Sequence, residues 1–187
     1  MERAIMNDVI CNGVNVTDLI STINAVKQDP SLADFRFMAE NQWLGGGHNR
    51  STFKDFYGCG KTDTSRSVPF EMDADEPAVL LSTDKGANPV EYILHGLAGC
   101  MTTSMVYHAA ARGVEIGGVD STFEGDLDLQ GFLGISEEVC KGYRQIRVNM
   151  RVETSASVET LSECISFSPV YEMISRSVPV DVHIETY

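Results

Sequence analysis

The sequence is poor in positive charge. Its 187 residues include 14 Lys and Arg against 27 Asp and Glu, which gives a formal net charge of -13. Binding to a phosphate backbone needs a concentrated basic surface, and no run of Lys and Arg occurs along the chain. We therefore expect no nucleic-acid partner.

Cysteine motifs are also missing. The five cysteines form no CxxC pair and no metal-ligand spacing with the four histidines. The first residues, MERAIMNDVICNG, lack the basic and apolar regions of an export signal. An odd number of cysteines without such a signal favours reduced thiols. We therefore expect a cytoplasmic protein without a metal site.

One long segment without charge stands out in what the chain does contain. Residues 88–113 read NPVEYILHGLAGCMTTSMVYHAAARG, and no Asp, Glu, Lys or Arg occurs from 92 to 111. Asn88 can cap a helix here, and Pro89 suits its first position. A helix with so little charge must be buried over most of its surface. Because polar and glycine residues dilute its apolar run, we expect a helix enclosed by sheets and not a membrane span.

The remaining segments are shorter and predict a mixed fold. A hydrophobic fraction of 43% excludes wholesale disorder, and strands followed by a long helix and further strands favour the α+β class. Apolar spacing and alternation predict helices at 15–28, 157–165 and 168–175, and strands at 33–44, 50–57, 69–72, 120–130, 143–153 and 178–186.

Two antiparallel pairings follow from this order. The segments 33–44 and 50–57 flank three glycines and predict a hairpin of half-buried strands. The segments 120–130 and 143–153 predict a second antiparallel pair. The acidic stretch at 73–77 lacks the ligand spacing of a calcium loop, so we expect it to be a solvated turn.

Four motifs stand out along the chain: NPVEYILHGLAGC, AAARG, EGDLDLQGFLG and SPV. Together they resemble the OsmC/Ohr family, the osmotically inducible protein C and organic hydroperoxide resistance proteins, over about residues 41–187. It implies an intertwined α+β homodimer in which a long central helix packs against antiparallel sheets. We accordingly divide the chain into an N-terminal helical extension, 1–32, and an OsmC-like domain, 33–187.

The resemblance also implies a redox activity. Family members reduce organic hydroperoxides with one cysteine that becomes a sulfenic acid, a second cysteine that resolves it as a disulfide, and an external dithiol. Cys100 stands at the position of the first cysteine. Arg50, in HNRS, matches the arginine that stabilises its thiolate. No bound cofactor is implied beyond the external thiol reductant.

The sequence departs from the family pattern at the start of the long helix. The family holds its arginine with a glutamate directly after the NP pair, where this chain has Val90. The neighbouring Glu91 would point away from Cys100, and we expect it to pair with His95 one turn later.

A second departure concerns recycling. The resolving cysteine of the family is replaced by Ser168, and a hydroxyl cannot form a disulfide. Cys164 could share a helix face with this position if the helix continued, although Pro169 argues against that. Cys59 and Cys140 fall in expected loops, where nothing activates a thiol.

The helix face around Cys100 suggests what could bind there. Small residues beside the thiol leave room for a substrate or a partner helix. His95 and His108 are expected as packing or interface residues, with a catalytic base as the alternative. The predicted binding residues are Ile93, Leu97, Ser104 and Ser168.

Two functions follow from these observations. The first is a thiol-dependent peroxidase that reduces organic hydroperoxides through Cys100 and recycles in an altered way. The second is a non-enzymatic protein of the same fold that binds a small apolar ligand.

Overall fold

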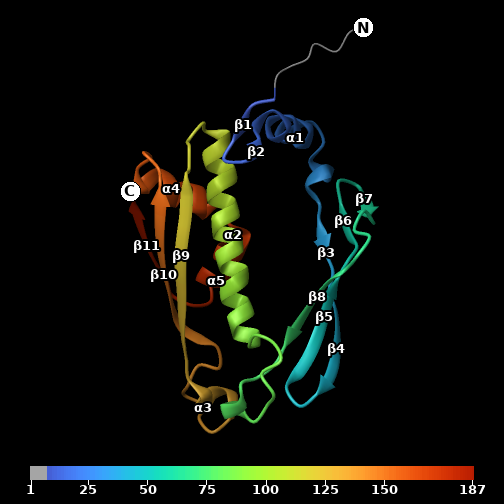
Figure 1. Ribbon diagram of the computed structural model, residues 1–187, viewed down its shortest axis with the longest axis vertical. Coiled ribbons are helices and arrows are strands. Elements are labelled where there is room, and N and C mark those ends of the chain that lie inside the picture. Colours follow the sequence, from blue (N-terminus) through green and yellow to red (C-terminus); the bar gives the residue numbers. More distant parts are fainter. Residues whose placement is uncertain (1–7) are drawn as a thin grey trace. The chain divides into compact units, whose positions relative to one another are not determined.

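The computed structural model describes residues 8–187 and has the expected α+β class (Figure 1). The chain divides into two compact units. The core unit contains the described residues up to Leu19 together with Leu94–Tyr187, and the strand unit is Ile20–Ile93. Helices α1 (Val16–Gln28) and α2 (Pro89–Ala111) each run from one unit into the other.

The core unit is built on a sheet with the strand order β11-β10-β9. Strands β9 (Gly118–Leu127) and β10 (Tyr143–Glu153) pair antiparallel, which confirms the prediction. Strand β11 (Val180–Thr186) is parallel to β10, so the sheet is mixed and not purely antiparallel. A parallel neighbour needs a crossover, and α4 (Val158–Ser166) and α5 (Pro169–Ser175) supply it.

The hydrophobic core of this unit lies between the sheet and its helices. Alternate residues of β10 point inward because side chains of a strand alternate between its two faces. Helix α2 contributes residues at four-residue spacing, which places them on one helix face. The fully buried members are Leu97, Met101 and Met105 of α2, Ile146, Val148, Met150 and Val152 of β10, and Leu161 and Cys164 of α4.

Helix α2 begins as the sequence predicts, but Glu91 has a different role from the expected one. The backbone N–H of Val90 donates to Asn88 Oδ1 at 3.0 Å, and the N–H of Asn88 donates to Glu91 Oε2 at 2.8 Å. This reciprocal arrangement is a capping box. The predicted pairing of Glu91 with His95 is therefore wrong, because the helix start uses this carboxylate.

No helix of residues 8–187 is long and apolar enough to cross a membrane.

The strand unit holds two three-stranded sheets, with the orders β3-β6-β7 and β4-β5-β8. The predicted hairpin is present, but each of its two expected strands is split in two. The first becomes β3 (Arg36–Phe37) and β4 (Glu40–Gly45), and the second becomes β5 (His48–Phe53) and β6 (Phe56–Gly58). Strands β7 (Lys61–Asp63) and β8 (Phe70–Ala74) complete the sheets. The segment 33–44 was expected to be half-buried, which is wrong, because Phe37 is 72% exposed.

The shorter elements include an N-terminal hairpin that the sequence did not predict. Strands β1 (Ile10–Cys11) and β2 (Val14–Asn15) are joined by Asn12 and Gly13, whose φ angles of 53° and 75° suit a tight hairpin turn. The Asn12 side chain donates to the Val114 carbonyl at 2.9 Å and accepts from the Ile116 N–H at 2.8 Å. The other short elements are η1 (Pro30–Ala33), η2 (Ala78–Leu80) and α3 (Leu129–Phe132).

Candidate functional site

Cys100 lies in the middle of α2 with one side of the helix open beside it. Its thiol is half-buried and takes part in no hydrogen bond or ion pair within residues 8–187. A Cβ added at Gly96 or Gly99 would meet no atom within 4 Å. The small residues that the sequence places around the thiol therefore leave space next to it.

The four predicted binding residues lie in different surroundings. Ile93 is 47% exposed, and Ser104 is half-buried. Leu97 and Ser168 are fully buried, with Leu97 in the hydrophobic core. Ile93 and Ser104 are thus the two whose side chains a molecule could reach directly.

Ser168 caps helix α5. Its hydroxyl accepts the N–H of Tyr171 at 3.2 Å, and Pro169 takes the first position of the new helix. Helix α4 has already ended at Ser166. Cys164 and Ser168 therefore do not share one continuous helix, as the position of Pro169 predicted.

Cys164 belongs to a cluster at the far end of α2. Arg112 Nη1 donates to Cys164 Sγ at 3.2 Å and to the His108 carbonyl at 3.2 Å, while Nη2 donates to Glu163 at 2.9 Å. Burial raises the pKa of the Cys164 thiol, and the neighbouring guanidinium opposes that rise.

The position of this cluster bears on whether Cys164 can resolve an oxidised Cys100. The His108 carbonyl lies about two helical turns beyond Cys100, or about 12 Å along the axis at 1.5 Å per residue. Disulfides need Cα atoms within about 7 Å of each other. In this structure Cys164 is a free thiol, and its contact with Arg112 lies beyond Cys100, toward the end of α2.

The remaining cysteines and histidines show no catalytic arrangement. Cys59 and Cys140 are exposed, and all five cysteines are free. The His108 ring stacks on Phe167 with centroids 4.2 Å apart, and burial lowers the pKa of His108. His95 is exposed. Within the described residues no group of three or more His, Cys, Asp or Glu could hold a metal ion.

Arg50 lies on β5 in the strand unit, where the sheet register places it directly opposite Asp73 of β8. Its Nε donates to Asp73 Oδ1 at 2.9 Å, and its Nη2 donates to Oδ2 at 2.8 Å. His48 Nε2 also lies 3.1 Å from Oδ1. Glu71 is a more distant neighbour, 3.8 Å from Nη1. Arg50 is therefore held by a two-point ion pair.

This ion pair changes the protonation equilibria of both groups. The hydrogen bond from Arg50 is the main cause that lowers the pKa of Asp73 from 3.8 to about 2, and His48 contributes. The same hydrogen bond raises the pKa of Arg50. Both groups are thus charged at neutral pH. The predicted action of Arg50 on the Cys100 thiolate remains a prediction.

The acidic stretch at 73–77 is not the solvated turn that the sequence suggested. Asp75 is fully buried and accepts hydrogen bonds from Ser82 Oγ at 2.5 Å and Thr83 Oγ1 at 2.7 Å. The N–H groups of Glu76 and Lys85 donate to it as well. These bonds, led by that from Ser82, lower the pKa of Asp75. A buried carboxylate therefore organises the loop that leads into α2.

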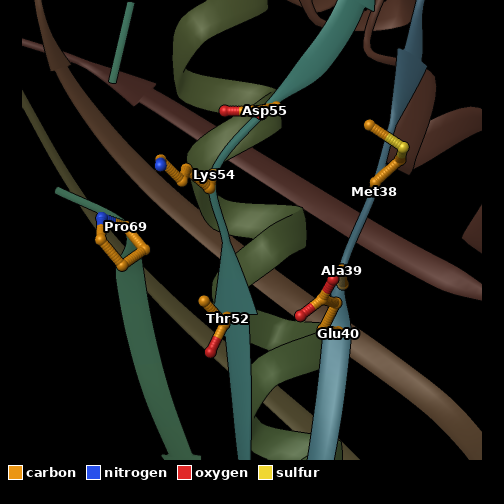
Figure 2. A pocket seen from close by; sticks show the side chains of 7 residues that line it. All are labelled: Met38, Ala39, Glu40, Thr52, Lys54, Asp55 and Pro69. Atoms are coloured by element: carbon orange, nitrogen blue, oxygen red, sulfur yellow. The ribbon is translucent and has the colours of Figure 1, made fainter. Parts of the chain in front are cut away.

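Two cavities lie in the strand unit. The first has a volume of about 290 Å³ and mixed polar and apolar walls, formed by Met38, Ala39, Glu40, Thr52, Lys54, Asp55 and Pro69 (Figure 2). The second, of about 370 Å³, is lined mainly by aromatic and Met side chains: Phe37, Met38, Phe53, Phe56, Phe70 and Met72, with Asp55 and Arg66. Asp55 Oδ1 is buried without a hydrogen-bond partner. None of the predicted site residues lines these two cavities.

One comparison with known proteins identifies a family. The family model described as OsmC-like protein matches residues 82–183, a range that excludes Arg50 and Asp73. No curated protein matches the sequence.

Similar solved structures extend over most of the chain. An OsmC-like protein from Mycoplasma pneumoniae is 16% identical, with a TM-score of 0.59 over 81% of this chain and 96% of that one. An organic hydroperoxide resistance protein from Legionella pneumophila is 16% identical, with a TM-score of 0.53 over 80% and 96%. One from Elizabethkingia anophelis is 14% identical, with a TM-score of 0.56 over 81% and 98%. At these identities the likeness is one of fold.

Proposed function

The chain belongs to the OsmC-like protein family, and from this premise we propose that it reduces organic hydroperoxides through Cys100 with an external thiol as reductant. The observation that supports this most directly is the setting of Cys100, a half-buried thiol on a helix without Asp, Glu, Lys or Arg from residue 92 onward, with open space at Gly96 and Gly99. Two structures of similar fold are described as organic hydroperoxide resistance proteins.

The proposed reaction begins with the Cys100 thiolate. It attacks one oxygen of the hydroperoxide, the O–O bond breaks, and the organic alkoxide leaves and takes up a proton as an alcohol. The sulfur is oxidised by two electrons to a sulfenic acid. Arg50 stabilises the thiolate in this scheme, because a nearby guanidinium lowers a thiol pKa.

Recycling then requires thiols from outside the chain. Ser168 has no sulfur, and Cys164, on α4, contacts Arg112 at the far end of α2 and forms no disulfide in this structure. A first external thiol attacks the sulfenic sulfur, water leaves, and a mixed disulfide forms. A second thiol then releases Cys100. We place this chemistry in the cytoplasm, where such thiols are kept reduced.

We also propose that the active form is a homodimer. Every buried hydrophobic side chain in residues 8–187 belongs to the core unit. The strand unit leaves Phe37, Trp43 and Phe70 between 62% and 72% exposed. Apolar surface on this scale marks a protein–protein contact, and a second copy of this chain is the partner that the family resemblance implies.

The direct test is consumption of cumene hydroperoxide in the presence of dithiothreitol. We expect Cys100→Ser to abolish turnover and Cys164→Ser, the matched control on a cysteine outside the site, to retain it. Equal turnover by wild type and Cys100→Ser would contradict the proposal.

The oxidation product tests the recycling step. After one equivalent of cumene hydroperoxide, mass spectrometry should find Cys100 trapped by a sulfenate reagent, with higher oxidation at excess peroxide. Ser168→Cys should divert this product to an intramolecular disulfide if the two side chains come within reach. A Cys100–Cys164 disulfide in the wild type would contradict the requirement for an external thiol.

A second candidate function is supported by the larger cavity of the strand unit. Its volume of about 370 Å³ and its aromatic lining suit a small apolar ligand. A chain that binds such a ligand but never oxidises Cys100 would be a binding protein of this fold. Binding of cumyl alcohol to Cys100→Ser, measured by calorimetry beside the peroxidase assay, distinguishes the two functions.

A further inference from the structure

Arg50 is held more rigidly than its partial exposure would suggest. Its side chain is 42% exposed, yet Asp73 binds it through two parallel hydrogen bonds of 2.9 and 2.8 Å. Such a fork orients the plane of the guanidinium as well as its position. A single-point contact would leave the group free to rotate.

Asp73 is itself fixed by neighbours on both sides. His48 Nε2 lies 3.1 Å from the carboxylate, and the Tyr92 hydroxyl donates to the Asp73 carbonyl at 2.6 Å. Tyr92 belongs to the first turns of α2, so the backbone of β8 at Asp73 is tied to the start of that helix. The carboxylate that orients Arg50 is therefore anchored through its backbone and its side chain.

The fork leaves part of the guanidinium available. An arginine has five N–H donors, and Asp73 occupies one on Nε and one on Nη2. The contact of Nη1 with Glu71 is long, at 3.8 Å. Arg50 can thus donate to a further anion while Asp73 keeps it in place.

The carboxylates near the start of α2 are already used elsewhere. Glu91 accepts the Asn88 N–H in the capping box, and Glu76 accepts the Asn88 side-chain amide. Position 90 is a valine. Asp73 is the carboxylate that makes two-point contact with Arg50 in the described residues.

We infer that Asp73 is a positioning residue, which orients the Arg50 guanidinium so that it can stabilise the Cys100 thiolate. This inference rests on the proposed function. It adds a residue from strand β8, outside the part of the chain that the family model matches. Asp73 acts through Arg50 and does not contact the reacting atoms.

The sign of a pKa change separates positioning from simple electrostatics. Removing a negative charge near a thiolate lowers the thiol pKa, whereas releasing an oriented guanidinium raises it. We expect Asp73→Asn to move the pH midpoint of Cys100 alkylation by iodoacetamide upward, read for Cys100 by mass spectrometry. At pH values well below this midpoint, each pH unit by which the midpoint rises lowers the rate of peroxide reduction about tenfold, because less of the thiol is ionised.

Glu71→Gln is the matched control. This substitution also removes one negative charge from β8, but Glu71 makes only the long contact of 3.8 Å with Arg50. We expect its midpoint to be unchanged or lower. Among the described residues, His48 is a further titratable group at this pair, 3.1 Å from Asp73 Oδ1, and the residue opposite Arg50 on β4 is the neutral Gln42.

The effect of Asp73 must also depend on Arg50. Arg50→Ala should raise the midpoint, and adding Asp73→Asn to Arg50→Ala should raise it no further. If Asp73→Asn does not fold at the assay temperature, Asp73→Ser is used instead. It should also move the pH midpoint of Cys100 alkylation upward. Thermal unfolding of each variant identifies losses of folded protein.

The outcomes distinguish this inference from the proposed function. If Arg50→Ala raises the midpoint but Asp73→Asn leaves it unchanged or lowers it, Asp73 is not the positioning residue and the peroxidase proposal stands. An equal rise for Glu71→Gln would likewise overturn the inference. If Arg50→Ala has no effect and Cys100→Ser retains turnover, both proposals fall.

Discussion

The two units of this chain are stabilised by different interactions. In the core unit, apolar side chains of α2, β10 and α4 are fully buried against one another. In the strand unit the buried residues are Gly58 and Asp75, and the most exposed aromatic side chains, Phe37 and Trp43, are each 72% exposed. The core unit thus has its own hydrophobic core, whereas the strand unit is held by sheet hydrogen bonds, ion pairs and stacked aromatic rings.

This difference bears on function as well as on stability. Cys100 is supplied by the unit with the dense core, and Arg50 by the unit that has none. Burying a large apolar side chain contributes about 1.5–3 kcal/mol, so the strand unit gains stability from any surface that covers its aromatic residues. A partner that provides such cover would also steady the sheet that carries Arg50.

The largest expected difference between the units appears on truncating apolar side chains. Leu161→Ala, at a fully buried position, should lower the free energy of unfolding by about 2–5 kcal/mol at any protein concentration. Phe37→Ala should cost less, and its cost should depend on protein concentration because Phe37 lies on the aromatic surface that the proposed dimer would cover. Denaturant unfolding at two concentrations measures both. An equally large, concentration-independent cost for Phe37→Ala would show that the strand unit has a core of its own.

Dimer formation gives the next largest effect. We expect a dimer by sedimentation at micromolar concentration, and we expect Phe70→Asp to raise the dissociation constant at least tenfold because it places a charge on the aromatic surface. Val9→Asp, at an exposed apolar residue of the core unit, is the control and should leave the dimer intact. A stable folded monomer of the wild type would contradict the explanation of the exposed aromatic surface.

The smallest effect is the pH dependence of the Arg50–Asp73 pair. The pKa of Asp73 is lowered from 3.8 to about 2 in the folded protein. The ion pair therefore contributes fully to stability at pH values above the pKa that Asp73 has in the unfolded chain. That contribution is lost as the pH falls through the folded value of about 2. The difference in melting temperature between wild type and Asp73→Asn should therefore be constant near neutrality and shrink below about pH 4. A difference that grows on acidification would contradict this assignment.

Some features of the molecule could be predicted from the sequence because they depend on neighbours along the chain. Caps and glycines mark the ends of α2, and alternation identifies β9 and β10. The small residues around Cys100 are visible in the sequence because helical spacing places them on the same side as the thiol. The family resemblance could be recognised in the same segments.

Other features were decided by contacts between residues far apart in the sequence. The pairing of Arg50 with Asp73 depends on the register of two strands, and Asp75 is buried by hydroxyl groups from a later loop. The contact of Arg112 with Cys164 joins the end of one helix to another helix. No local pattern carries such information, because periodicity and caps report on a single element at a time. Only the tertiary structure therefore identified the carboxylate that holds Arg50 and placed the Cys164 thiol against Arg112.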